Sequence, residues 1–278
     1  MNGTFSDEPC LGGGDPSFLP TDCSPTAAIS AFTLAKSGFA GYSRPMLKRA
    51  AILLFIVSLA VNSRWVLGPI DWTVLPALLI GWFLADLASG VIHMALDYLP
   101  CPPGIGLGTM FHYPGSRESD AYLALRRQTL AKIGPFQRLV FDFKNHHPRP
   151  DALGRRSFLT LVGSTIFAVG LPVSLLLNAV SFVWPVPGWF MAGATSLLVG
   201  GVLAQYFHGT LHRDDIPAIV RVMRHMGLLM TPAAHQIHHD SLQRDFATNC
   251  GWSNPFINPV FRFLHRRGVL TDQGLEPI

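Results

Sequence analysis

Four long apolar blocks constrain the fold of this chain more than any other feature. They run over about residues 50–67, 72–96, 158–183 and 189–211. Each block approaches the roughly 20 residues that an α-helix needs to cross the hydrocarbon layer of a membrane. We therefore predict an all-α integral membrane protein with four transmembrane helices over these ranges.

The composition supports a membrane protein. Of the 278 residues, 49% are hydrophobic and only 14% are charged, whereas soluble domains carry about 25% charged residues. The net charge of +4 arises from basic residues between the apolar blocks. Because this placement is typical of membrane topology, we expect no nucleic-acid partner. The four cysteines form no CxxC pair, which argues against a zinc ribbon or a disulfide framework.

The distribution of basic residues predicts the orientation. The short links Gly68–Asp71 and Trp184–Gly188 contain no Lys or Arg, whereas the linker over residues 97–157 and both flanks of the apolar region contain many. Cytoplasmic loops of membrane proteins carry an excess of Lys and Arg. We therefore expect a multi-pass protein with both termini and the long linker on the cytoplasmic side.

The remaining segments define the predicted domain boundaries. Residues 1–47 are rich in Ser, Pro, Asp and Gly and lack the pattern of a signal peptide, so we expect a disordered N-terminal segment. Residues 48–270 form the predicted membrane domain, and residues 271–278 form a tail. Ile216–Met230 is apolar with interspersed basic residues, which indicates an amphipathic helix at the membrane interface.

Histidines are the candidate functional residues. Eight of the eleven fall into four clusters. Because the second and fourth predicted helices both run toward the cytoplasm, their C-terminal ends meet the linker and the tail at one face of the membrane. All four clusters are therefore expected at that face. They are His93 with Asp97 four residues later, His146 with His147, His208 with His212, and His235 with His238 and His239.

The spacing within these clusters suits metal binding. Residues four apart share one face of a helix, so His208 and His212 can reach one site, as can His93 and Asp97. A helical HxxHH segment over residues 235–239 can direct all three of its histidines into one pocket. Neutral imidazole binds iron, zinc and copper. Eight imidazoles exceed the four ligands of a tetrahedral ion, which favours a centre with two metals and positions open for oxygen.

Other polar residues have weaker signals. Asp86 lies seven residues before His93, so it either orients a ligand imidazole or makes a polar helix contact. Gln205 lies three residues before His208 and is a second candidate for orienting a ligand. The isolated His112, His225 and His265 are expected to lie outside the metal centre.

Several of these motifs resemble those of the Kua-type membrane lipid desaturases, the family that includes plasmanylethanolamine desaturase and the chloroplast phosphatidylglycerol desaturase. The similarity extends over about residues 72–270. The matching motifs are Ala85–His93 with Asp97, His146–Pro148, His208–His212, His235–His239 and Asn249–Asn254. The resemblance implies that all eight clustered histidines bind two iron ions and that Asp97 is essential. We expect Asp97, His93 and His239 to be catalytic.

The favoured function is oxygen-dependent desaturation of an alkyl or acyl chain of a membrane phospholipid, including conversion of plasmanyl to plasmenyl lipid. The sequence contains no NAD(P) or haem motif, so we expect a separate small electron carrier such as cytochrome b5 or ferredoxin, with O2 as co-substrate. A membrane lipid hydroxylase with the same histidine chemistry is the alternative. A metal transporter or sensor is less favoured, because transporters place their ligands near the middle of the membrane.

Overall fold

The computed structural model describes residues 26–66 and 72–278, with side chains described from residue 46 onward. The described residues contain helices and irregular segments but no strand. The chain divides into two compact units, residues 1–44 and 45–278. In the first unit, residues 26–44 belong to α1 (Thr26–Val66). Helix α1 begins within the N-terminal segment, and the predicted disorder of residues 1–47 stays a prediction. Residues 1–25 lie outside the described part.

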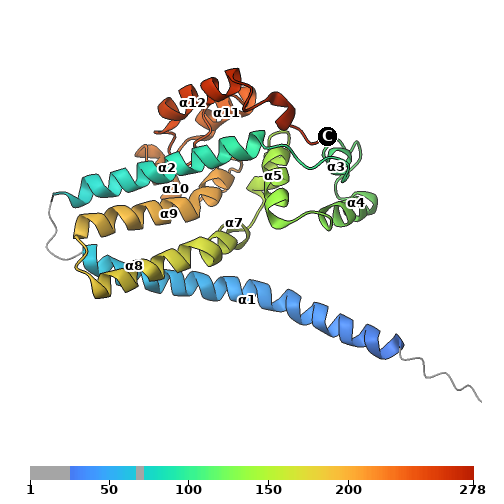
Figure 1. The fold of residues 1–278 in the computed structure, drawn as a ribbon, viewed down its shortest axis with the longest axis horizontal. Helices are drawn as coiled ribbons and strands as arrows, with labels where there is room; N and C mark the ends of the chain where they lie inside the picture. Colours follow the sequence, from blue (N-terminus) through green and yellow to red (C-terminus); the bar gives the residue numbers. More distant parts are fainter. Residues whose placement is uncertain (1–25, 67–71) are drawn as a thin grey trace, which may run out of the picture. The chain divides into compact units, whose positions relative to one another are not determined.

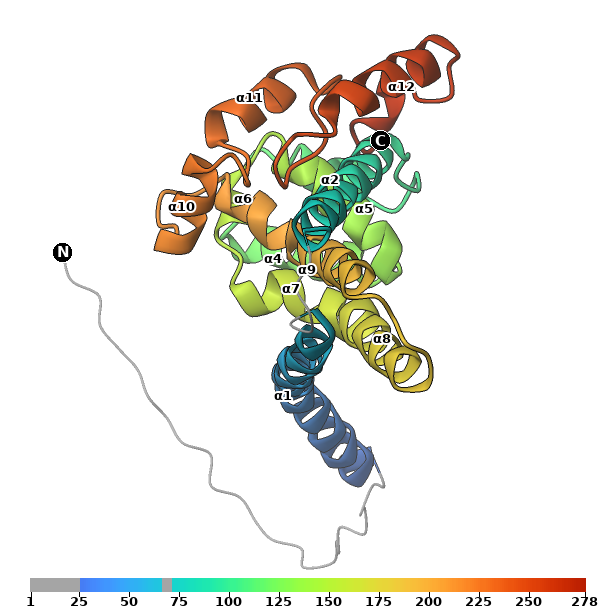
Figure 2. The same cartoon turned by 90° about the vertical axis from the view of Figure 1, so that its left-hand side faces the viewer.

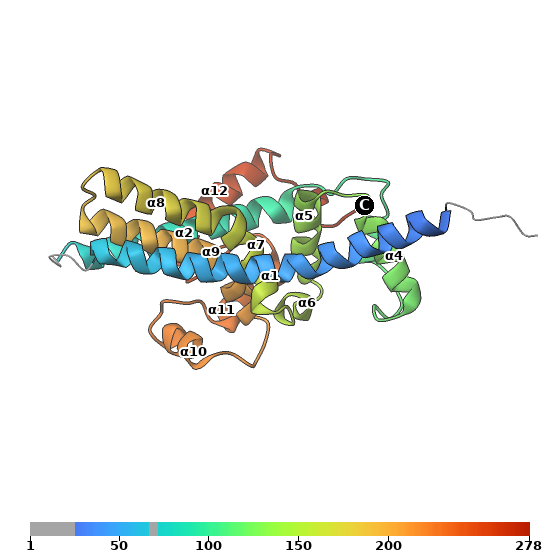
Figure 3. The ribbon, with the colours of Figure 1, turned by 90° about the horizontal axis from the view of Figure 1, so that it is seen from below.

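The second unit contains the predicted apolar spans. Met46–Val66 of α1, α2 (Val74–Tyr98), Phe158–Val183 and α9 (Gly188–Thr210) are each long and apolar enough to cross a membrane. They confirm the all-helical prediction with four candidate spans. Within this unit the helices run side by side (Figures 1 and 3). The first predicted link, residues 68–71, falls in the segment that the structure does not describe.

The third span contains a local change of helix type. It consists of α7 (Phe158–Thr165), a π-helical turn (Ile166–Gly170) and α8 (Leu171–Val183). Proline at position 172 has no N–H and cannot continue the regular i to i−4 hydrogen bonding. The backbone N–H of Leu171 instead donates to the carbonyl of Ile166, five residues earlier. The span therefore accommodates Pro172 through a π-turn and continues beyond it.

Small residues bring α2 and α9 into close contact. A Cβ atom added to Gly81 would lie 2.1 Å from the carbonyl oxygen of Gly193, and one added to Gly200 would lie 2.6 Å from the Cβ of Ala85. Small residues of this kind allow membrane helices to approach closely. Because both helices run in the same direction, their histidine-bearing C-terminal ends lie at one end of the molecule.

The linker between the second and third spans folds into short helices at that same end (Figure 1). These are α3 (Leu107–Phe111), α4 (Asp120–Leu130), α5 (Pro135–His146) and α6 (Asp151–Gly154). Leu107, Met110, Tyr122 and Val140 are among the side chains of its own buried apolar cluster. The linker is therefore a folded subdomain, and its helix α5 delivers His146 and His147 to the ends of α2 and α9.

The C-terminal segment covers one side of the α2–α9 pair (Figure 2). It contains α10 (Ala218–His225), α11 (Pro232–Ser241), α12 (Asn254–Arg266) and a 3₁₀ turn over Asp272–Gly274. The helix expected over Ile216–Met230 is shorter than predicted, since Pro217 precedes its start and Gly227 adopts a positive φ of 70° after its end. The tail packs against α2, where a Cβ on Gly274 would lie 2.0 Å from the carbonyl oxygen of Tyr98.

Candidate metal centre

Four helices, α2, α5, α9 and α11, converge on the site. Helix α2 contributes His93 and Asp97, and α9 contributes His208, with His212 just beyond its last residue. Helix α5 ends at His146 and is followed by His147. The rings of His93 and His208 lie 4.9 Å apart between their centroids, which is a direct result of the close α2–α9 packing.

Helix α11 carries the remaining three histidines, and its sequence explains where it starts and stops. The hydroxyl of Thr231 accepts a hydrogen bond from the N–H of Ala234, and Pro232 occupies the first turn. Both features favour a helix N-terminus. The helix ends at Ser241, and the residue that follows it, Leu242, has a left-handed φ of 55°. This short helix presents His235, His238 and His239 toward the ends of α2 and α9.

The nine predicted residues form two groups, each with its potential ligand atoms within 4.8 Å of one another. We call them the five-histidine group and the Asp97 group. The five-histidine group consists of His146, His208, His212, His235 and His239. The Asp97 group consists of His93, Asp97, His147 and His238.

The division into groups corrects one expectation. The histidines of the HxxHH segment do not share one group, since His238 belongs to the Asp97 group while its two neighbours belong to the other. The adjacent His146 and His147 are divided in the same way. Consecutive residues on a helix point about 100° apart, so adjacent histidines reach two neighbouring sites.

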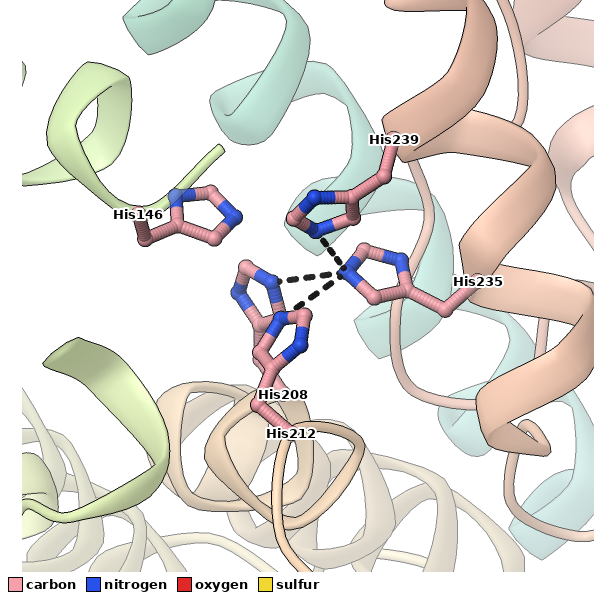
Figure 4. Close-up of side chains that lie close together, drawn as sticks. All are labelled: His146, His208, His212, His235 and His239. Carbon is pink, nitrogen blue, oxygen red and sulfur yellow. Dashed lines mark hydrogen bonds between the residues drawn. The ribbon is translucent and has the colours of Figure 1, made fainter. Parts of the chain in front are cut away.

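The five-histidine group is centred on His235 (Figure 4). Its Nε2 lies 3.1 Å from the Nε2 of His208, 3.2 Å from that of His212 and 3.1 Å from that of His239. A neutral imidazole carries one N–H, so His235 can donate to at most one of these neighbours. The buried Nε2 of His146 has no partner in the described structure. This concentration of nitrogen lone pairs suits a cation.

In the Asp97 group, three imidazoles surround one carboxylate. The Asp97 oxygens lie 3.3 Å from the Nε2 of His93 and 3.4 Å from the Nε2 atoms of His147 and His238. Asp97 and His238 are fully buried, and His93 is nearly so. Neither oxygen of Asp97 has a hydrogen-bond partner within the described residues. Such a buried carboxylate is costly unless a cation lies beside it.

Backbone carbonyl groups determine which nitrogens can bind a metal. The Nδ1 of His93 lies 2.9 Å from the carbonyl oxygen of Phe246, and the Nδ1 of His238 lies 2.8 Å from that of Arg244. A carbonyl oxygen can only accept, so each Nδ1 carries the hydrogen and donates it. In the neutral form of either ring, the Nε2 is then an unprotonated acceptor that faces the Asp97 carboxylate. A metal ion between these atoms would resolve the repulsion, and donation from the far ring nitrogen is usual for histidine ligands.

Burial favours the neutral form of five clustered histidines that lie outside the membrane spans. It lowers the pKa of His146, His147 and His235 far below the usual value, and the neighbouring imidazoles lower it further. The pKa falls to about 3 for His212 and to about 4 for His239, again mainly through burial. Because metal ligands must be neutral imidazoles, the site is ready to bind metal at neutral pH.

Asp86 organises the polypeptide around the site instead of touching the histidines. Its carboxylate accepts hydrogen bonds from the N–H groups of Cys250, Gly251 and Ser253 at 2.8–3.0 Å and from the Ser253 hydroxyl at 2.7 Å. Gly251 has a φ of 78°, which favours glycine. Of the two interpretations of Asp86, the structure therefore supports a polar contact. It fixes the segment that follows Phe246, whose carbonyl orients His93.

Lys144 is a buried residue of the site that the sequence analysis overlooked. Only 1% of its surface is exposed, and its ammonium donates to the backbone carbonyls of Leu96 and Asp97. Burial lowers its pKa to about 8. A cation that binds the last carbonyls of a helix is stabilising. Lys144 therefore fixes the end of α2 next to Asp97. In the sequence it was one of many basic linker residues, and no signal distinguished it.

The isolated histidines lie outside both groups, as expected. His112 is exposed, with its Nε2 3.7 Å from a carboxylate oxygen of Glu276, and His225 is also exposed. The Nε2 of His265 lies 3.1 Å from a carboxylate oxygen of Asp272. The side chain of Gln205 lies beside His208 but forms no hydrogen bond with it among the described contacts.

A mostly apolar cavity of about 220 Å³ leads to the histidines. Ala88 and Ile92 of α2, Gly201 and Ala204 of α9 and Phe143 of α5 contribute to its walls. His93 and His208, one from each group, also line it. The cavity thus connects both candidate metal positions to an apolar space of the kind that a hydrocarbon chain could fill.

Comparison with known proteins agrees with this arrangement. A family model for the lipid desaturase domain matches residues 129–276, more than half of the chain. The chain is 26% identical to the plasmanylethanolamine desaturase of Myxococcus xanthus over 210 residues, which is 74% of this chain and 64% of that protein. It is also 26% identical over 162 residues to the chloroplastic fatty acid desaturase 4 of Arabidopsis thaliana, covering 57% of this chain and 39% of that protein.

Both matches therefore span less than two thirds of the curated relatives. No solved structure matches the chain significantly. Together with the four apolar helices, these relationships identify a multi-pass membrane protein.

Proposed function

Because the chain belongs to the lipid desaturase domain family, we propose that it is an oxygen-dependent enzyme with two irons that introduces a double bond into an alkyl or acyl chain of a membrane phospholipid. The observation that carries this proposal is the pair of adjacent ligand groups. Within the Asp97 group, the Nε2 atoms of three imidazoles face the two oxygens of one buried carboxylate, and none of these atoms has a hydrogen-bond partner within the described residues. Their nitrogen and oxygen donors suit iron.

The eight clustered histidines and Asp97 would hold the two ions. Bound iron would supply the oxidising power of O2, which a polypeptide alone does not provide. In the overall reaction, a CH2–CH2 unit loses two hydrogen atoms, and O2 is reduced to two water molecules with two further electrons and two protons. A separate small carrier, cytochrome b5 or a ferredoxin, would deliver the electrons.

The protein itself would position the hydrocarbon chain of the lipid and exclude water. The apolar walls formed by α2, α5 and α9 would hold the hydrocarbon against His93 and His208. Burial of these two side chains, 2% and 1% exposed, keeps bulk water from the reacting carbons. Holding reactants in a suitable geometry is a major source of rate enhancement.

The names of the relatives suggest which lipids to examine first. One is called a plasmanylethanolamine desaturase and the other a fatty acid desaturase. We propose a plasmanyl lipid, which carries an alkyl ether chain, as the first substrate to test and an acyl phospholipid as the second. The excess of basic residues in the long linker supports a cytoplasmic position for the metal centre and both termini.

The proposal is tested by the product that the purified protein forms. Detergent-purified protein supplied with iron, a reductant, O2 and either lipid is expected to yield product two mass units lighter than the substrate. Mass spectrometry separates the alternatives, because a hydroxylase would add one oxygen atom, or 16 mass units. A metal transporter or sensor would bind metal but leave the lipid unchanged, and that result would contradict an enzymatic role.

The variant Gly201→Leu tests whether the cavity holds the hydrocarbon chain of the lipid during the reaction. A Cβ atom at Gly201 meets no heavy atom within 4 Å, so the larger side chain would occupy the cavity without displacing the protein. We expect at least a 10-fold loss of kcat/KM with unchanged iron content. Ala60→Leu, on the exposed face of α1, is the control and should retain wild-type turnover. Equal turnover by both variants would place the substrate elsewhere.

A further inference from the structure

Two cavities meet at the side chain of Gln205. The first is the apolar cavity of about 220 Å³, and the second is a space of about 20 Å³ on the side of α5 and α6. The second is large enough for about one water molecule. Leu139, Phe143, Gln205 and His208 line both. Together these four residues separate the two spaces, and of the four only Gln205 carries a neutral amide.

The surroundings change from apolar to charged across this boundary. On one side, the larger cavity extends along α9 to Gly201, seven residues before His208, or about 10 Å at 1.5 Å per residue. On the other side, the smaller cavity is lined by Asp142 and Arg156. These two residues form an ion pair with an N–O distance of 3.0 Å and are partly exposed. A lipid whose hydrocarbon chain lies in the larger cavity would have its polar linkage beside Gln205. Its charged headgroup would lie outside the smaller space, which is too small to hold it.

The Gln205 amide has an unused capacity for hydrogen bonding. Its side chain is half-buried and makes no hydrogen bond within the described residues. An amide in a cavity wall that makes no hydrogen bond to the protein can donate its N–H to a bound ligand with an acceptor atom, which would stabilise the ligand there. Gln205 precedes His208 by three residues and lies on the same helix face. An acceptor bound to the amide would therefore lie close to the candidate metal positions.

We propose that Gln205 fixes which carbons of the substrate's hydrocarbon chain face the histidines. It would do so by donating an amide N–H to the ether or ester oxygen that joins this hydrocarbon chain to glycerol. This inference rests on the proposed desaturase function. The hydrogen bond would hold the linking oxygen one helical turn from His208 and direct the chain into the apolar cavity. The carbons nearest the linkage would then face the histidines, and the double bond would form near that end of the chain.

The variant Gln205→Met tests this role, since it keeps the length of the side chain and removes the N–H donors. Loss of one hydrogen bond is expected to raise KM for the accepted lipid by about 2- to 10-fold. The double bond should also appear at neighbouring positions, whereas bound iron should remain at the wild-type level. Gln128→Met makes the same change at an exposed position of α4 and should alter neither quantity. A wild-type KM and a single unchanged product from Gln205→Met would overturn the proposal.

A substrate analogue makes the test independent of how well the variant folds. We expect the wild-type protein to bind a lipid whose linking oxygen is replaced by CH2 about 2- to 10-fold more weakly than the parent lipid, in competition with a fluorescent lipid. Equal binding would overturn the role of Gln205 even if Gln205→Met cannot be purified. Parallel measurements with alkyl ether and acyl ester lipids identify which oxygen is recognised. Failure of the wild-type protein to desaturate either lipid would instead contradict the proposed function.

Discussion

Replacement of Asp97 by asparagine is expected to lower lipid desaturation by about 100-fold, while the protein still folds and inserts into membranes. The Asp97 carboxylate lies 3.3–3.4 Å from three imidazole nitrogens and is fully buried. Asparagine preserves the shape but removes the negative charge that would attract the cation. Loss of a residue that supports metal ligands typically costs about 10- to 100-fold in metal affinity or activity, and direct contact with iron would place the loss at the upper end.

Asp151→Asn provides the matched control for this experiment. Asp151 forms an ion pair with Arg155 at the surface of α6, and exposed pairs contribute about 0–1 kcal/mol to stability. Turnover and bound iron should therefore match the wild type. If Asp97→Asn also retained full iron and full turnover, Asp97 would have no role in the centre.

The second large effect is expected from removing one histidine of either group. His147→Ala removes a ligand of the Asp97 group, and His212→Ala removes one of the five-histidine group. Each variant should lose more than about 100-fold in turnover, because oxidation by a two-metal centre requires both ions. His93→Ala and His239→Ala should behave in the same way. Product formation is to be measured at matched abundance in membranes.

His265→Ala is the control for the histidine series. His265 pairs with Asp272 at the surface, outside both groups, so its loss should leave turnover unchanged. Normal turnover by His147→Ala alone, with His212→Ala inactive, would indicate that a single metal bound by the five-histidine group is sufficient.

Helix-forming spans and the convergence of the histidines could be predicted because both depend on simple properties of the sequence. The length of an apolar block determines whether it can cross a membrane, and the observed spans differ from the predicted ones by a few residues. The alternation of direction in successive spans then places the ends of α2 and α9 on the same side. This topology brings His93 and His208 together across 115 residues of sequence (208 − 93), without knowledge of the detailed packing.

The division of the ligands between two groups depends on detailed packing. Sequence spacing shows that His235 and His239 share a helix face, but it does not show that His238 turns to Asp97 instead. That outcome depends on the angle at which α11 crosses the ends of α2 and α9. It also depends on the carbonyl of Arg244, which holds the Nδ1 of His238.

The supporting residues were the least predictable. The spacing of Asp86 from His93 leaves its role open, because the N–H groups that it binds lie more than 160 residues away in sequence. Lys144 lacks a distinctive pattern, and only its burial against the end of α2 distinguishes it from the exposed basic residues of the linker. Contacts of this kind arise from the folded chain and have no periodic signal.

Metal content is the most direct test of the two-metal centre. The wild-type protein, purified in detergent from cells grown with iron, should contain about two irons per chain by elemental analysis. His147→Ala and His212→Ala should each retain one iron or fewer, because each removes a ligand from a different group. Active wild-type protein that contained stoichiometric zinc and no iron would contradict the account.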